Sequence, residues 1–142
     1  MSIEDTREIA ADSATVWSLT LDVENWPALT STITSVERLD DGPLRVGSQA
    51  RIKQPGQRPR VWTVSRLDPP HAFEWFTTIG PLRMTGAHAI RPTPNGCENT
   101  LSIRLEGWGR RVAEALLGRA LRRTITTENH GFVVASEAAT AR

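Results

Sequence analysis

The chain has 142 residues, the length of one ordinary domain, which can bury a core without disulfides. Seventeen basic and sixteen acidic side chains leave a net charge of +1, which disfavours a dedicated nucleic-acid-binding protein. The single cysteine, Cys97, excludes an internal disulfide and any site with several cysteine ligands. No apolar run approaches the ~20 residues of a membrane span, and the N-terminus lacks a secretion signal. We therefore expect a soluble cytoplasmic protein without stable membrane insertion.

The N-terminal third predicts one strand and two short helices. A first strand fits residues 3–10, and the N-capping pair that begins at Asp12 predicts a helix over 13–22. A second short helix or turn covers 25–30, and a further strand fits 32–40.

Glycine and proline divide the middle of the chain into stretches of strand length, which is typical of an antiparallel meander. Alternation over 82–90 places Met84 and His88 on one apolar face, and residues 100–106 alternate as a half-buried strand. The expected strands are 46–54, 59–68, 71–79, 82–92 and 97–107.

The C-terminal segment predicts a long helix. No proline occurs from Gly109 to Ala138, and Gly131 indicates a kink or a close approach. Two apolar lines form a broad stripe, as expected of a helix packed on something large: Val112, Leu116 and Ala120, and then Leu117, Leu121, Ile125 and Phe132.

This order predicts an α+β fold in which a curved antiparallel sheet of about seven strands wraps around the long helix. One helix cannot fill the hollow of such a sheet across its full width. The remaining space between helix and sheet is a natural site for an apolar molecule.

Short segments along nearly the whole chain resemble the START-like or SRPBCC superfamily, particularly its polyketide cyclase/dehydrase and lipid-transport-like branch. They are ATVW at 14–17, DVENWP at 22–27, VGS at 46–48, WTV at 62–64, DPP at 68–70, FEW at 73–75, HAIRP at 88–92, Gly96 and the final helix. The resemblance implies a single helix-grip (START/Bet v 1-like) domain over 1–142 with a cavity for a hydrophobic ligand. It implies no fixed chemistry, because the superfamily includes carriers, cyclases and regulatory binders.

Recognisable catalytic and metal motifs are missing from the sequence. The three histidines, His71, His88 and His130, lack zinc-motif spacing, and no nucleophile elbow or phosphate loop occurs. We expect no metal and no cofactor, and we interpret Cys97 as a packing residue.

Two ionisable side chains are the candidates for catalysis. His88 could act on a ligand from the cavity wall, or it could be a hydrogen-bonded core histidine, which we favour. Glu128 shares a helix face with Thr124 and could also face the cavity. The favoured alternative is a solvated charge that pairs with Arg122 or Arg123.

Aromatic side chains on the predicted strands can line the cavity or fill the core. Trp26, in a loop before Pro27, could cap the cavity mouth or plug the space between the short helices and the sheet. The predicted ligand-binding residues are Trp26, Trp62, Val64, Phe73, Trp75, Met84, His88, Ile103, Thr124 and Glu128.

Three functions remain open. The first is binding of a small hydrophobic or aromatic molecule. The second is a polyketide cyclase or dehydratase, in which His88 and Glu128 move protons while Trp62 and Trp75 position the substrate. The third is a protein-interaction or co-chaperone-like module, which an exposed apolar patch would favour. The arginines of 110–123 allow a contact with an anionic surface, although a solvated helix face is the simpler interpretation. We expect no nucleic-acid partner, and a homodimer stays open.

Overall fold

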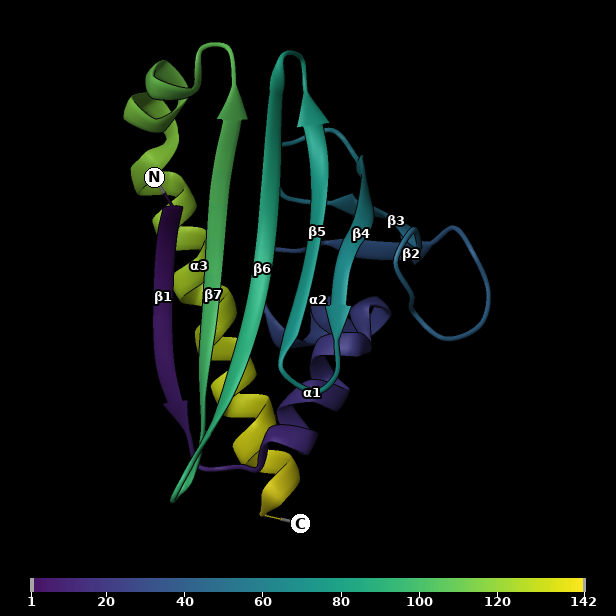
Figure 1. Ribbon diagram of the computed structural model, residues 1–142, viewed down its shortest axis with the longest axis vertical. Coiled ribbons are helices and arrows are strands. Elements are labelled where there is room, and N and C mark those ends of the chain that lie inside the picture. The colour runs from purple at the N-terminus through teal and green to yellow at the C-terminus, as the bar shows by residue number, and fades with distance from the viewer. Residues whose placement is uncertain (1, 142) are drawn as a thin grey trace.

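The computed structural model describes residues 2–141 and contains one seven-stranded antiparallel sheet (Figure 1). The strand order is β1-β7-β6-β5-β4-β3-β2, so the first strand pairs with the last. The elements are β1 (Ser2–Ile9), α1 (Ser13–Leu21), η1 (Val23–Asn25), α2 (Trp26–Leu29), β2 (Ser35–Arg38), β3 (Gln49–Lys53), β4 (Arg60–Asp68), β5 (Ala72–Ile79), β6 (Leu82–Thr93), β7 (Gly96–Gly107) and α3 (Arg110–Thr140).

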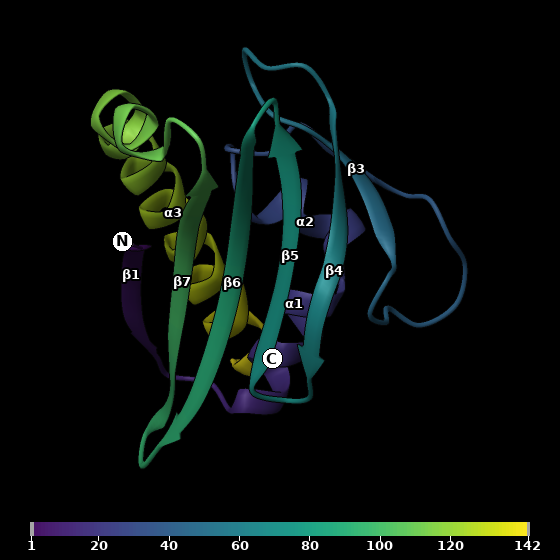
Figure 2. The same ribbon diagram turned by 45° about the horizontal axis from the view of Figure 1, so that its top comes forward.

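The helices share one side of the curved sheet. Helix α3 runs along β1 and β7, while α1 and α2 lie beside its C-terminal half (Figures 1 and 2). The predicted order of one strand, two short helices, six strands and one long helix is therefore confirmed, and so is the helix-grip architecture. This arrangement places the concave face of the sheet opposite α3.

A bulge in β4 changes which side chains face the interior. The register between β4 and β5 shifts between Val64 and Arg66, so Val64 pairs with Trp75 and Leu67 pairs with Phe73. Strict alternation along the strand would place Leu67 on the face opposite Val64. The extra residue of the bulge returns Leu67 to the inner face, where it packs against the core.

A buried amide network attaches α3 to the sheet. The Asn129 side chain is fully buried, and its Nδ2 donates to the Asp5 carboxylate at 3.0 Å and to the backbone oxygens of Asp5 and Asn99. Its Oδ1 accepts from Nδ2 of Asn99 at 2.9 Å. The network bridges α3 to both β1 and β7, so it fixes the position of the helix along the sheet.

Gly131 explains how closely α3 approaches α2. A β carbon built at Gly131 would clash with the backbone carbonyl oxygen of Leu29. Of the two roles that the sequence left open for this glycine, the structure shows the close approach.

The two halves of α3 differ in burial. Its buried residues, from Ile125 to Ser136, all lie in the C-terminal half. Although Ala120 borders the space between α3 and the sheet, the inward facing predicted for the rest of its line is wrong, because Val112 is 64% exposed and Leu116 is 77% exposed. These side chains point away from the core, and only the other line, through Ile125 and Phe132, reaches it.

Candidate functional site

A cavity of about 420 Å³ lies between the concave face of the sheet and α3. This volume falls within the roughly 300–1,000 Å³ that small-molecule sites occupy. Exposed members of the lining, Gln57, Leu117 and Ala120, mark its mouth. Most of the remaining lining is apolar: Trp26, Ile33, Ile52, Trp62, Trp75, Ile79, Met84, Leu101, Ile103, Leu121 and Ile125.

Tryptophan rings form one wall of the cavity. Trp75 on β5 packs against Trp62 on β4 and against Trp26 on α2, with ring centroids 5.8 and 5.2 Å apart. Gly86 on β6 lies opposite Trp75, and a β carbon there would touch both sheet tryptophans at 3.6 Å. Because 3.6 Å is an ordinary van der Waals contact, the two rings pack closely over the Gly86 backbone, and a methyl group there would still fit.

Trp26 closes the interior end of the cavity. Its indole Nε1 donates to the backbone oxygen of Leu19 at 3.2 Å, and its ring packs on Phe73, His88 and Phe132. Since Trp26 is only 4% exposed, it is a plug between α2 and the sheet and not a cap over the mouth.

His88 occupies an aromatic environment. The ring lies among Trp26, Phe73 and Phe132, with centroid distances of 5.2–5.6 Å. Burial lowers the pKa of His88 to about 3, so the imidazole is neutral at physiological pH. Within residues 2–141, the buried Nδ1 atom has no hydrogen-bond partner. The structure therefore contradicts the favoured interpretation of a hydrogen-bonded core histidine at this nitrogen.

Glu128 is the second ionisable group of the cavity. Its Oε1 accepts a hydrogen bond from the Thr32 hydroxyl at 3.0 Å. Burial raises the pKa of Glu128 to about 7, although the bond from Thr32 acts in the opposite direction. The favoured ion pair with Arg122 or Arg123 is wrong, because the carboxyl lines the cavity and bonds to Thr32 instead. Glu128 can therefore gain or lose a proton near neutral pH.

Comparison with known protein families identifies one that spans most of the chain. The sequence profile described as "Polyketide cyclase / dehydrase and lipid transport" matches residues 1–137. The chain belongs to this family. No curated protein matches it in a sequence search.

Several solved structures share the fold of this chain. TTHA0849 from Thermus thermophilus is 16% identical with a TM-score of 0.78, over 98% of this chain and 99% of that protein. The di-domain ARO/CYC StfQ from the steffimycin pathway is 13% identical (TM-score 0.79), over 99% of this chain and 52% of StfQ. The di-domain ARO/CYC BexL from the BE-7585A pathway is 18% identical (TM-score 0.80), over 100% of this chain and 48% of BexL. The chain thus spans about half of each di-domain protein, and these identities establish the fold alone.

Eight of the ten predicted ligand-binding residues line the cavity of this family member. They are Trp26, Trp62, Trp75, Met84, His88, Ile103, Thr124 and Glu128. Thr124 donates its hydroxyl to the Ala120 carbonyl, so its polar group is already satisfied. That these residues bind a ligand stays a prediction.

Val64 and Phe73 do not line the cavity, which corrects the sequence-based assignment. They are 2% and 0% exposed, and the ring of Phe73 is covered by Trp26, Trp75 and His88. Both side chains face inward as expected, but they lie in the core layer beneath the tryptophan wall.

Sequence reasoning missed four polar side chains of the lining, namely Gln54, Gln57, Arg60 and Ser102. Arg60 precedes Trp62 by two residues and pairs with Ile52 across the strands, so it lies on the same face. Strict alternation from Trp62 would have identified it.

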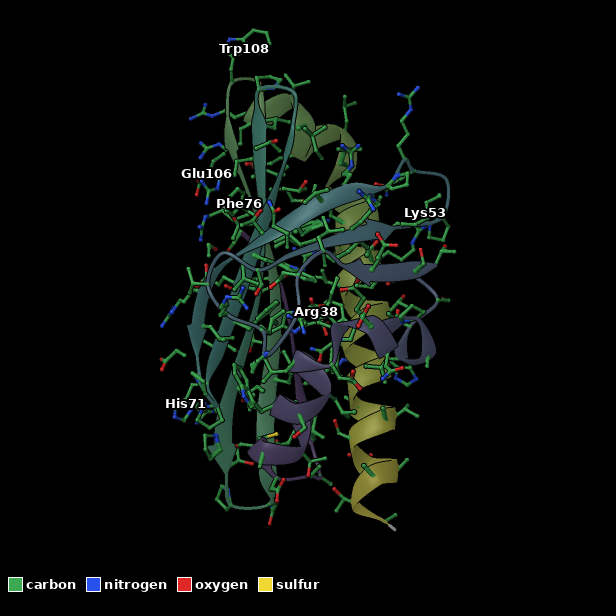
Figure 3. All side chains as sticks on the ribbon, turned by 90° about the vertical axis from the view of Figure 1, so that its right-hand side faces the viewer. Arg38, Lys53, His71, Phe76, Glu106 and Trp108 are labelled. Atoms are coloured by element: carbon green, nitrogen blue, oxygen red, sulfur yellow. The ribbon has the colours of Figure 1, made fainter. Side chains whose placement is uncertain are left out.

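Four further observations concern the chain outside the cavity. The part of the chain that the structure describes holds no cluster of three or more His, Cys, Asp or Glu side chains suited to a metal. None of its helices is long and apolar enough to cross a membrane. Cys97 is fully buried at the start of β7, in keeping with a packing role. At the top of Figure 3, Trp108 projects into solvent, and Val112 and Leu116 of α3 are exposed as well.

Proposed function

We propose that this protein binds a small hydrophobic or aromatic molecule in the cavity between the sheet and α3. The observation that carries the proposal is the 420 Å³ space itself, because tightly packed interiors rarely leave voids larger than a water molecule. An apolar space with an open mouth has a lower free energy when an apolar ligand fills it than when water does.

The tryptophan wall favours a ligand with a flat or elongated shape. Trp62 and Trp75 offer ring surface on strands that pairing holds in place, so little side-chain entropy is lost on binding. The further contacts we expect are to Met84 and Ile103, which complete the apolar lining.

Titration with the neutral fluorescent probe N-phenyl-1-naphthylamine tests the proposal. We expect saturable binding that Trp75→Ala weakens about tenfold, because the variant removes the central ring of the wall. Trp108→Ala is the matched control, since this tryptophan is 83% exposed and lies outside the cavity. Absence of saturable binding, or equal effects of the two variants, would contradict the proposal.

A second candidate is a cyclase- or dehydratase-type enzyme that uses the same cavity on a poly-β-ketone substrate. The observation in its favour is that Glu128 lines the cavity and has a pKa of about 7, the range in which a carboxyl exchanges protons efficiently. His88 stays neutral, so it would hold a carbonyl oxygen by a hydrogen bond and would not store a proton. The cavity would exclude water while the poly-β-ketone substrate forms its ring.

Turnover separates the two candidates. Product formation from a poly-β-ketone thioester analogue, followed by mass spectrometry, should be lost in Glu128→Gln and His88→Ala while both variants still bind the neutral probe. Unchanged turnover in either variant would remove that residue from the mechanism, and no turnover by the unaltered protein would leave binding as the function.

We also infer a single ligand-binding domain over 1–142 that acts in the cytoplasm without a nucleic-acid partner. The near-zero net charge supports the absence of a nucleic-acid partner, because nucleic-acid-binding domains usually carry a basic excess. Size-exclusion chromatography with light scattering would show whether the protein forms a homodimer.

A further inference from the structure

One end of the cavity carries a positive charge without a counter-ion. Arg60 begins β4 on the inner face of the sheet and lines the cavity together with Gln54 and Gln57. Across residues 2–141, no carboxylate forms an ion pair with its guanidinium. Its Nε atom is buried and lacks a hydrogen-bond partner.

The other arginines of β2, β3 and β4 have a carboxylate partner, whereas Arg60 does not. Arg51 pairs with Glu37 at 2.6 Å and Arg66 pairs with Glu74 at 3.2 Å, on the outer face. Only Arg60 turns toward the cavity, where a buried donor without an acceptor costs free energy. An acceptor supplied by a ligand would remove that cost.

The segment of the chain that surrounds Arg60 is also positively charged. Residues 42–67 contain six basic side chains and no acidic one. Arg45, Arg51 and Arg66 of this segment pair with Asp40, Glu37 and Glu74, which leaves Lys53, Arg58 and Arg60 without a carboxylate partner among residues 2–141. The segment around Arg60 therefore attracts anions, although the chain as a whole is nearly neutral.

The one carboxyl in the lining does not neutralise Arg60. Glu128 bonds to Thr32, and its pKa is raised by burial, whereas a guanidinium beside it would lower that pKa. The cavity is thus polarised, with a free cation near the mouth and aromatic rings at the interior end.

We propose that the ligand is an anionic amphiphile whose carboxylate binds Arg60 and whose apolar body lies against Trp62 and Trp75. This deepens the proposed function and rests on it. The planar guanidinium matches a carboxylate with two parallel hydrogen bonds, and the side-chain amides of Gln54 and Gln57 add neutral donors. A single guanidinium balances a singly charged head group.

Competition against N-phenyl-1-naphthylamine tests the proposal with matched probes: 2-naphthoate against 2-naphthalenemethanol, and dodecanoate against 1-dodecanol. In the unaltered protein we expect each carboxylate to bind about tenfold tighter than its alcohol. Arg60→Gln should abolish this preference, so that each carboxylate binds no tighter than its alcohol. Arg58→Gln, an exposed position in the same loop that does not line the cavity, should keep the preference.

The outcomes are distinguishable. Binding of the neutral probe without a carboxylate preference, or equal loss in the Arg58 and Arg60 variants, would overturn the anionic subsite and leave the proposed function standing. Absence of binding by every probe would overturn both. If Arg60→Gln lowers the melting temperature strongly, Arg60→Lys serves instead. Lysine keeps the positive charge but cannot form two parallel hydrogen bonds to a carboxylate, so the carboxylate preference should fall and become more sensitive to salt. An unchanged preference would count against the assignment.

Discussion

Replacing Glu128 by glutamine should make the protein more stable at neutral pH. The folded-state pKa of Glu128 is about 7, against 4.5 for an ordinary glutamate, because the carboxyl is buried. The folded protein therefore binds more protons than the unfolded chain between these values, and stability falls as the pH rises through this window. At 1.36 kcal/mol per unit, the shift amounts to about 3 kcal/mol as an upper bound.

His88 should produce the opposite slope. Burial lowers its pKa from 6.5 to about 3, so the unfolded chain binds the extra proton and stability rises with pH between these values. The two slopes overlap between pH 4.5 and 6.5 and nearly cancel in the unaltered protein. Each slope becomes visible only when the other group is removed.

Urea unfolding followed by tryptophan fluorescence, from pH 4.5 to 8, measures both effects. Relative to the unaltered protein, Glu128→Gln should gain stability as the pH rises, by up to about 3 kcal/mol at pH 8. His88→Phe fits among the surrounding rings and should expose the falling slope of Glu128. A stability difference between Glu128→Gln and the unaltered protein that is independent of pH would refute the placement of this carboxyl in the cavity wall.

Two further predictions concern the attachment of α3. Asn129→Ala should lower the free energy of unfolding by about 2–4 kcal/mol in urea, because it leaves the buried strand groups that it bridges without partners. A loss below about 0.5 kcal/mol would show that water replaces the amide. Gly131→Ala should cost about 1–3 kcal/mol, since the added methyl group meets the Leu29 carbonyl oxygen. Gly118→Ala, where the space is open, should instead raise the melting temperature, and equal effects of the two alanines would contradict the close approach.

The strands could be predicted well because nearby turn residues determine where each strand ends. Turn residues such as Gly80 and Gly96 have positive φ angles and separate the hairpins, so the expected 82–92 and 97–107 match Leu82–Thr93 and Gly96–Gly107 closely. Alternation within β6 also placed His88 correctly on the inner face.

The errors arise where distant parts of the chain decide the outcome. An apolar stripe cannot show how far the core extends beneath a helix, so Leu116 was placed inward although it is exposed. The bond between Thr32 and Glu128 joins residues 96 positions apart, and no local pattern indicates it. The bulge after Val64 likewise reversed the facing of Leu67.

The uneven burial of α3 has a kinetic consequence. Its C-terminal half is fixed by Ile125, Asn129 and Phe132, whereas its N-terminal half covers the cavity with few buried side chains and contains Gly118. Local opening free energies follow the density of buried contacts, so the first turns of the helix separate from the sheet at lower cost than the rest. A ligand of the proposed kind would therefore exchange through transient fraying of these turns, at a rate set independently of the global unfolding of the protein.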